Sequence, residues 1–333
     1  MPNNLQNWLA LTVEEPIDPE IAIIDAHHHL WDYPTSRFLT QDLLHDTSSG
    51  HNIVQTVFVE CLSMYRTSGP AELRSVGETE FVCRIANTNV DNTAQTHVAS
   101  GIVGFADLTL GDSVIPALEA HIEAGEGRFR GIRHAANWHE SPDIGNGHTN
   151  PPAHLLSDPK FREGFACLQK FDLSFDGWLY HPQLTEFADL AISYPDTAII
   201  LDHMGMPLGI GPYAGKRDEV FTEWKHGIDQ VAACGNVAVK LGGLGMKICG
   251  FQWHKMETPP TSQMLADAFA PYVEYCIDHF GVERCMFESN FPVDKLSFSY
   301  TVLWNAFKRI VADYTTEEKM ALFHDTAARV YGL

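Results

Sequence analysis

The sequence predicts an α/β protein whose alternating strands and helices close into a (β/α)8 TIM barrel. Eight short apolar runs occur along the chain, and they alternate with stretches that have helical periodicity. A doubly wound open sheet is the main alternative, but no Gly-x-Gly-x-x-Gly motif follows the first run. We therefore expect one domain over residues 1–333, with residues 1–19 as an N-terminal extension that packs across the barrel bottom or forms an interface.

The predicted strands are continuous apolar runs, as expected for a parallel sheet that is covered on both faces. They span residues 22–25, 55–60, 101–106, 131–134, 173–177, 198–202, 237–241 and 285–288.

The predicted helices lie between these strands, and two of them have clear start signals. Asp158 is expected to be the N-cap of a helix whose first residue is Pro159. Thr315 and Glu318 have the spacing of a capping box. The helices span residues 72–87, 113–124, a stretch from 159, 182–193, 218–233, 262–280, 299–312 and 316–331.

Two connections are longer than the others and allow for some distortion of the barrel. Residues 135–157 follow the fourth strand and residues 242–261 follow the seventh. Because barrel enzymes build their sites at the carboxyl ends of the strands, we expect both loops beside the site.

The charge of the chain restricts its partners. With 22 basic and 43 acidic residues the formal net charge is −21, which repels nucleic acids and anionic membranes. No apolar run is long enough to cross a bilayer, and residues 1–7 lack the features of a secretory signal. We expect a cytoplasmic protein acting on a small molecule, and leave a homo-oligomer open. The seven dispersed cysteines contain no Cys-x-x-Cys pair and are expected to be reduced and mostly buried.

The strongest local signal is the run Ile-Ile-Asp-Ala-His-His-His-Leu-Trp-Asp at residues 23–32. Residues two apart on a strand point the same way, so His27 and His29 project together and His28 faces oppositely. Two imidazoles at the end of an apolar strand are a ready pair of metal ligands or polar catalytic groups.

Residues 25–32 resemble the opening motif of the amidohydrolase superfamily, and more narrowly of its amidohydrolase-2 group, which contains 2-pyrone-4,6-dicarboxylate lactonase and sugar-acid lactonases. The resemblance extends over nearly the whole chain. Further matching segments are residues 131–133, 177–184, 201–207, 239–241 and 289–292.

The resemblance implies a set of site residues. His27 and His29 are the strand-one pair, and His181, just beyond strand five, is the third histidine of a metal or substrate site. His203 at the end of strand six is an acid–base or substrate-binding group, unless it is a structural partner of Asp202. A divalent metal, zinc first, is implied, and a metal-free site with the same histidines contacting substrate stays open.

The main departure from the family pattern lies at strand eight, where the usual aspartate is replaced by Asn290. An amide cannot take a proton from water at neutral pH, although its oxygen can still act as a ligand. The available carboxylates are Glu288, which shares a strand face with Asn290, and Asp294. Glu60 at the end of strand two is a further candidate, as an additional metal ligand or as the base.

Substrate-binding residues are expected at the same end of the barrel. Arg133, at the end of strand four, has a fork that suits a substrate carboxylate, unless it forms a salt bridge inside the protein. Tyr65, Arg66 and Lys240 are weaker candidates, and Trp178 is expected to form a pocket wall unless it only packs.

No Gly-x-Ser-x-Gly elbow and no cysteine in a nucleophile setting is present, so attack by an activated water is the natural route. We therefore expect a metal-dependent hydrolase, a lactonase that opens a small cyclic ester bearing a carboxylate. A decarboxylase is the second hypothesis, which the replacement by Asn290 favours. A barrel that has lost catalysis and serves as a binding protein is the third.

Overall fold

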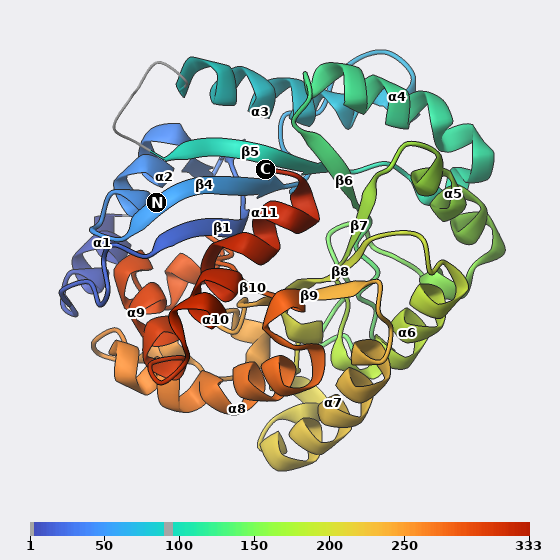
Figure 1. Ribbon diagram of the computed structural model, residues 1–333. Helices are drawn as coiled ribbons and strands as arrows, with labels where there is room; N and C mark the ends of the chain where they lie inside the picture. The colour runs from blue at the N-terminus through green and yellow to red at the C-terminus, as the bar shows by residue number, and fades with distance from the viewer. Residues whose placement is uncertain (1–2, 90–95) are drawn as a thin grey trace.

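The computed structural model describes residues 3–89 and 96–333 and contains an eight-stranded parallel sheet that curves into a barrel (Figure 1). Residues 1–2 of the expected extension and residues 90–95 lie outside the described residues. The strands follow one another around the sheet in chain order. They are β1 Ala22–His28, β4 Asn52–Val59, β5 His97–Gly104, β6 Phe129–Arg133, β7 Ser174–Gly177, β8 Ile199–Leu201, β9 Val237–Leu241 and β10 Cys285–Phe287.

The barrel closes just beyond the ends of β1 and β10. His28 forms an isolated parallel bridge with Phe291, and the His29 N–H donates to the Phe291 carbonyl at 2.8 Å. The Asn290 N–H donates to the His27 carbonyl at 2.9 Å. The predicted (β/α)8 barrel is confirmed, and its distortion is this closure by a few hydrogen bonds instead of a continuous ladder.

Helices form a ring outside the sheet (Figure 1). Asp158 caps its helix as predicted, because its Oδ1 accepts from the N–H groups of Lys160 and Phe161 at 2.8 and 2.9 Å. The ring consists of α3 Val76–Asn89, α4 Ile115–Ala124, α5 Pro159–Lys170, α6 Leu184–Ser193, α7 Arg217–Ala232, α8 Ser262–Phe280 and α9 Tyr300–Ile310.

The structure departs from the predicted elements at both ends of the chain. The last helix, expected over residues 316–331, is divided by a π-helical turn. Its pieces are α10 Thr316–Met320, η11 Ala321–Asp325 and α11 Thr326–Tyr331. Besides several 3-10 turns, the described residues contain short elements that were not predicted: α1 Asn3–Leu9, α2 Thr40–Thr47, and the antiparallel pair β2 Trp31–Tyr33 and β3 Ser36–Phe38.

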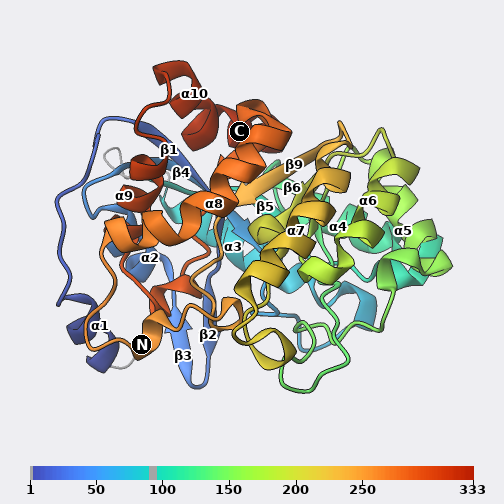
Figure 2. The ribbon, with the colours of Figure 1, turned by 90° about the horizontal axis from the view of Figure 1, so that it is seen from below.

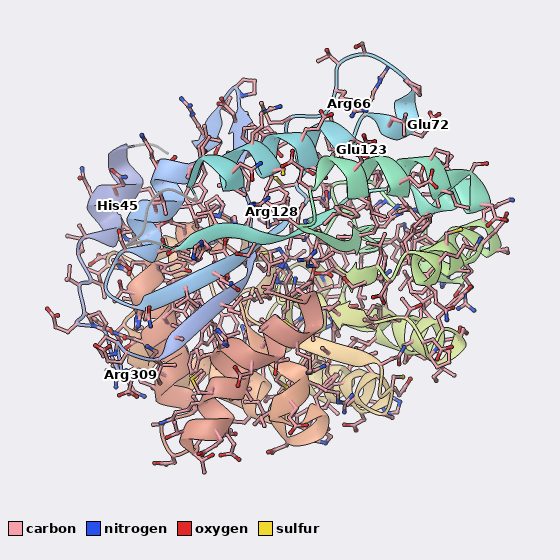
Figure 3. All side chains as sticks on the ribbon, turned by 45° about the horizontal axis from the view of Figure 1, so that its top comes forward. His45, Arg66, Glu72, Glu123, Arg128 and Arg309 are labelled. Atoms are coloured by element: carbon pink, nitrogen blue, oxygen red, sulfur yellow. The ribbon has the colours of Figure 1, made fainter. Side chains whose placement is uncertain are left out.

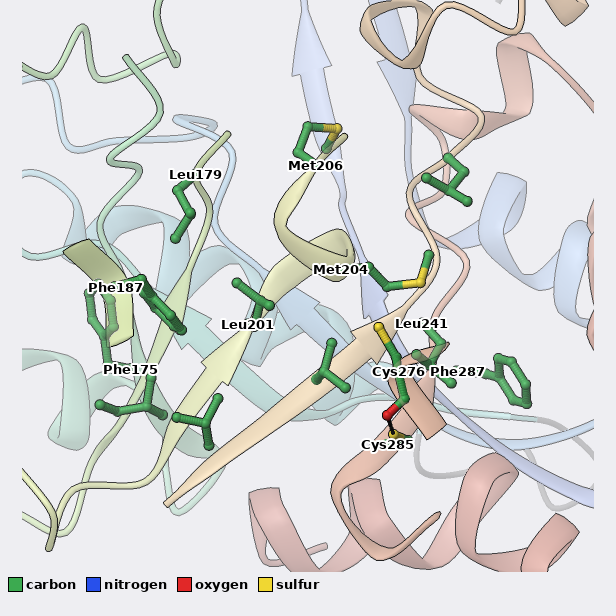
Figure 4. Packing of buried hydrophobic residues seen from close by; sticks show 14 of the residues in the cluster. Phe175, Leu179, Phe187, Leu201, Met204, Met206, Leu241, Cys276, Cys285 and Phe287 are labelled. Atoms are coloured by element: carbon green, nitrogen blue, oxygen red, sulfur yellow. Dashed lines mark hydrogen bonds between the residues drawn. The ribbon is translucent and has the colours of Figure 1, made fainter. Parts of the chain in front are cut away.

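The strands alternate between two apolar layers. Outward residues such as Phe175, Leu201 and Phe287 pack against the helices (Figure 4). Inward residues such as Ile24 and Val57 fill the barrel, where Tyr331 of α11 joins them. The C-terminal helices therefore cover the amino ends of the strands, and the opposite end is left for a site.

The N-terminal extension lies elsewhere than across the barrel bottom. The Trp8 indole donates to the Met256 carbonyl at 3.0 Å, and the Thr12 hydroxyl to the Pro259 carbonyl at 2.7 Å. These partners belong to the loop after β9. Figure 2 shows α1, the β2–β3 pair and the loop after β6 toward one end of the barrel and α10 at the other.

All seven cysteines are free thiols, six of them buried, as the sequence predicts. Among the described residues, no helix has the length and apolar character that a membrane span requires.

Candidate active site

The first strand ends in a pair of buried histidines that face each other. The Nε2 atoms of His27 and His29 are 3.3 Å apart. The Nδ1 of His29 donates to the Val59 carbonyl at 2.8 Å, which fixes the ring. His28 faces the other way, as expected, and its Nε2 lies 2.9 Å from the Thr56 hydroxyl.

Both ring nitrogens of His27 have close polar neighbours. Its Nδ1 lies 2.9 Å from Oε2 of Glu288 and 3.3 Å from Nζ of Lys240, and its Nε2 lies 3.3 Å from Nη1 of Arg133. Burial lowers the pKa of both His27 and His29, which favours the neutral form of each imidazole. Because Nδ1 of His29 is the donor, its Nε2 carries the lone pair, and this lone pair faces Nε2 of His27.

Glu288 joins His27 to a third histidine. Its Oε1 accepts from Nδ1 of His203 at 2.6 Å and from the His203 backbone N–H at 3.2 Å. Burial raises the pKa of Glu288, but the two histidines outweigh this and lower it to about 2. His203 itself has a left-handed backbone (φ 54°) and packs on Gly243, where a Cβ would lie 2.5 Å from the imidazole.

The two cations of the site are bound by carboxylates. Arg133 donates through Nε to Oε1 of Glu60 at 2.7 Å, and its Nη1 lies 3.5 Å from Asp202. Lys240 Nζ lies 2.6 Å from Asp176 and 3.0 Å from Asp202. All five side chains are buried. Arg133 therefore forms the internal salt bridge, the alternative to a free anchor for a substrate carboxylate, and Lys240 is likewise neutralised.

Carboxylates outnumber the arginine and lysine side chains in this cluster. Burial raises the pKa of Asp176, but even with Asp176 neutral the three carboxylates of Glu60, Asp202 and Glu288 exceed the charges of Arg133 and Lys240. Both oxygens of Asp202 and one of Glu288 lack a well-directed hydrogen bond. Buried carboxylates that outnumber their cations are costly unless a further cation compensates them.

These residues fit a divalent metal ion, and the structure therefore contains a candidate metal site. Ligand atoms of His27, His203 and Glu288 lie within 4.8 Å of one another. The 3.3 Å between Nε2 of His27 and of His29 is also the separation of two nitrogens on a tetrahedral zinc ion, about 3.3 Å for bonds of about 2.0–2.1 Å.

His181 does not join the histidine pair. Four residues beyond Gly177, at the end of β7, the chain has already turned into the short 3-10 helix η4 His181–Gln183. Its Nδ1 accepts from the Leu208 N–H at 3.3 Å, and its Nε2 lies 3.7 Å from Glu223. The implied set of three histidines is therefore not assembled, because His181 contacts the segment after β8 and helix α7.

Glu60 belongs to a different group from the metal candidates. Besides Arg133 it binds His148, whose Nε2 lies 2.9 and 3.1 Å from the two carboxylate oxygens. Burial raises the pKa of Glu60, but Arg133 and His148 lower it to about 2. Glu60 thus contacts Arg133 and His148, whereas the residues whose ligand atoms lie close together are His27, His203 and Glu288.

His148 is a site residue that sequence reasoning missed. It lies in the long loop after β6, and its ring stacks on Trp178, with centroids 5.3 Å apart and planes at 25°. Trp178 is half-buried, its ring lies 5.3 Å from the Arg133 guanidinium, and its indole N–H has no hydrogen-bond partner. The only available signal was the position of the loop; nothing distinguishes His148 from its other histidines.

The strand-eight residues form a separate hydrogen-bonded unit. Asn290 has a left-handed backbone (φ 54°), and its amide donates to Oδ1 of Asp294 at 3.0 Å. Oδ2 of Asp294 accepts from the Gly245 N–H at 2.9 Å. Burial raises the pKa of Asp294 to about 7. Asp294 therefore supports this turn, and Glu288 is the carboxylate that contacts the histidines.

Of the remaining substrate-binding candidates, Arg66 is at the surface. Its guanidinium pairs with Glu80 at 2.5 Å, and Figure 3 shows it on the outer loop that also carries Glu72. The expectation that Arg66 binds substrate is therefore not supported. Tyr65 is half-buried, and its hydroxyl has no hydrogen-bond partner.

Comparison with known proteins places the chain in a family. The family model described as Amidohydrolase matches residues 24–333. An uncharacterized protein, y4mH of Sinorhizobium fredii, is 36% identical over 94% of this chain and 99% of its own length. An L-fucono-1,5-lactonase of Burkholderia multivorans is 24% identical, covering 93% of this chain and 96% of the relative.

Among solved structures, an amidohydrolase from Burkholderia multivorans with bound zinc superimposes with a TM-score of 0.70 at 23% identity, covering 94% of this chain and 99% of that one. This likeness concerns the fold, which agrees with the barrel described above. The chain belongs to the amidohydrolase family and is a hydrolase enzyme.

Proposed function

We propose that this enzyme hydrolyses a small neutral lactone by attack of an activated water. The observation that carries the proposal is the Glu288–His203 pair, 2.6 Å apart, directly beside the two facing histidines of β1. A carboxylate that orients an imidazole is the usual arrangement of a general base. The likeness to proteins named L-fucono-1,5-lactonase supports the same reaction class.

The roles of the residues follow from their contacts. His27 and His29 would hold a divalent ion, zinc by analogy with the zinc-containing amidohydrolase, through their Nε2 atoms. Such an ion, when bound, polarises the carbonyl of the ester. Glu288 fixes His203 through Nδ1, so that the free Nε2 of His203 takes a proton from the attacking water.

The charges favour a neutral substrate over the carboxylated one that the sequence analysis expected. Arg133 and Lys240 are the cations that the described residues bring to the cluster, and both contact carboxylates. A substrate carboxylate would enter a buried region in which both of these cations already pair with carboxylates, which is unfavourable. Trp178 offers an unpartnered indole N–H that suits a neutral oxygen acceptor.

The same charges give less support to the decarboxylase hypothesis, since a decarboxylase must also bind a substrate carboxylate. The binding-protein hypothesis predicts no turnover at all. In the experiment, the enzyme is incubated with a panel of neutral sugar lactones and one carboxylated pyrone lactone. Hydrolysis is measured as proton release, and the product is identified by its mass.

We expect hydrolysis of at least one neutral lactone, with a product heavier by one water. His203→Asn should lower kcat/KM by about 100-fold or more, in the range of general base catalysis, while His226→Asn on the exposed face of α7 should not. Release of carbon dioxide without ring opening, or no hydrolysis of any lactone, would overturn the proposal.

A further inference from the structure

A second histidine–carboxylate pair lies at the same end of the barrel, and the proposed mechanism does not yet use it. His148 donates to Glu60 at 2.9 Å, just as His203 donates to Glu288 at 2.6 Å. Both carboxylates follow barrel strands and are fully buried. The two pairs come from separate parts of the chain, because His148 lies in the loop after β6 and His203 follows β8.

Trp178 connects the two pairs. Its ring stacks on His148, with centroids 5.3 Å apart, and meets His203 edge-on, with centroids 6.4 Å apart. Each histidine therefore lies beside the same half-buried side chain. A small ring that contacts Trp178 is within reach of both imidazoles.

The exposure of the two histidines differs. The His148 side chain is 23% exposed, whereas that of His203 is 2% exposed. A buried base that contacts only protein and substrate suits the abstraction of a proton from one ordered water. A histidine at the rim can contact the substrate atom that leaves and then exchange its proton with solvent.

We infer that His148 is the general acid of the lactone hydrolysis, held in position by Glu60. The inference rests on the proposed function. Water attacks the carbonyl carbon and gives its proton to His203. The bond between that carbon and the ring oxygen then breaks, and the electron pair stays on the oxygen, which takes the proton from His148.

A proton donor is needed at this position because of the leaving group. An alkoxide is about as basic as hydroxide, whose conjugate acid water has a pKa of about 15.7, so it leaves poorly at neutral pH. A thiolate is far less basic, since a thiol has a pKa of about 8.5. Replacing the ring oxygen by sulfur therefore removes the need for the acid while the shape of the ring is nearly kept.

The experiment compares His148→Gln on two substrates: the neutral lactone that the wild type hydrolyses best, and the thiolactone of the same ring. The glutamine amide can still donate to Glu60, so the loop contact is retained, but it cannot transfer a proton. We expect kcat/KM to fall about 100-fold on the lactone, within the range for general acid catalysis. On the thiolactone the change should stay within about threefold.

The control variant is His154→Gln in the same loop, whose side chain is 81% exposed. It should keep wild-type rates on both substrates. If His148→Gln lowered kcat/KM equally on the lactone and on the thiolactone, the role of His148 would be merely structural and the inference would be overturned. Failure of the proposed function can be distinguished from failure of this inference, because in the former case the wild-type enzyme would hydrolyse no lactone.

Discussion

Nδ1 of His203 lies 2.6 Å from Oε1 of Glu288, and the other oxygen of Glu288 lies 2.9 Å from Nδ1 of His27. One carboxylate thus orients two imidazoles that arise more than 170 residues apart in the chain. Neither histidine can lose this partner without exposing a free carboxylate oxygen to a buried, apolar surrounding.

Glu288→Gln should lower kcat/KM by about 100-fold or more, with little change in fold, because the amide is of similar size but cannot stabilise an imidazolium. Steady-state kinetics on the best lactone checks this. Glu163→Gln, which changes a carboxylate that pairs with Lys160 and is 39% exposed, is the control. A variant that keeps wild-type activity would contradict the role of Glu288.

The fold and the strand-one pair were predictable because both depend on local pattern. Apolar runs define the strands, and the two-residue repeat of a strand places His27 and His29 on one face. Contacts between side chains from different strands of the barrel were not predictable. His181 was carried over by resemblance, but the chain turns before it, and Arg133 is neutralised by Glu60 from a strand two places away. His148 sits in an irregular loop, whose course no periodicity describes.

Metal content tests the facing pair. We expect one divalent ion per chain in the purified wild type and none in His27→Ala, because an ion needs both Nε2 atoms. Elemental analysis of both proteins after gel filtration gives the answer. A metal-free wild type that hydrolyses lactones would contradict this prediction and would leave Arg133, 3.3 Å from His27 Nε2, as the positive charge beside the pair.

Lys240→Met should lower the free energy of unfolding by about 3–5 kcal/mol, because it leaves buried carboxylates without their cation. Lys240 is buried and pairs with Asp176 and Asp202 at 2.6 and 3.0 Å. Urea unfolding measures the loss. Lys170→Met, which removes a cation from an exposed pair with Asp112, should change the value by less than about 1 kcal/mol.

Asp294 should make the folded state less stable as the pH rises. Burial raises its pKa from 3.8 to about 7, so the folded protein holds a proton that the unfolded chain releases. Its contribution to stability is complete below pH 3.8 and is lost as the pH rises toward 7. The stability of Asp294→Asn should therefore depend less on pH over this range, as thermal unfolding at several pH values will show. An unchanged pH slope would contradict the raised pKa.

The position of His203 depends on a glycine, and this can be tested without touching a titratable group. Gly243 has a φ of 73°, and a Cβ on it would lie 2.5 Å from the His203 ring. Gly215 has nearly the same backbone, with a φ of 75°, but nothing lies within 4 Å of its added Cβ. Gly215→Ala therefore carries only the strain of a left-handed residue, about 1–2 kcal/mol, and should keep full activity. Gly243→Ala carries the same strain and also moves the imidazole away from Glu288, so kcat/KM should fall by about tenfold or more. If both variants lose activity equally, backbone strain and not the placement of His203 is responsible, and the proposed base loses its structural support.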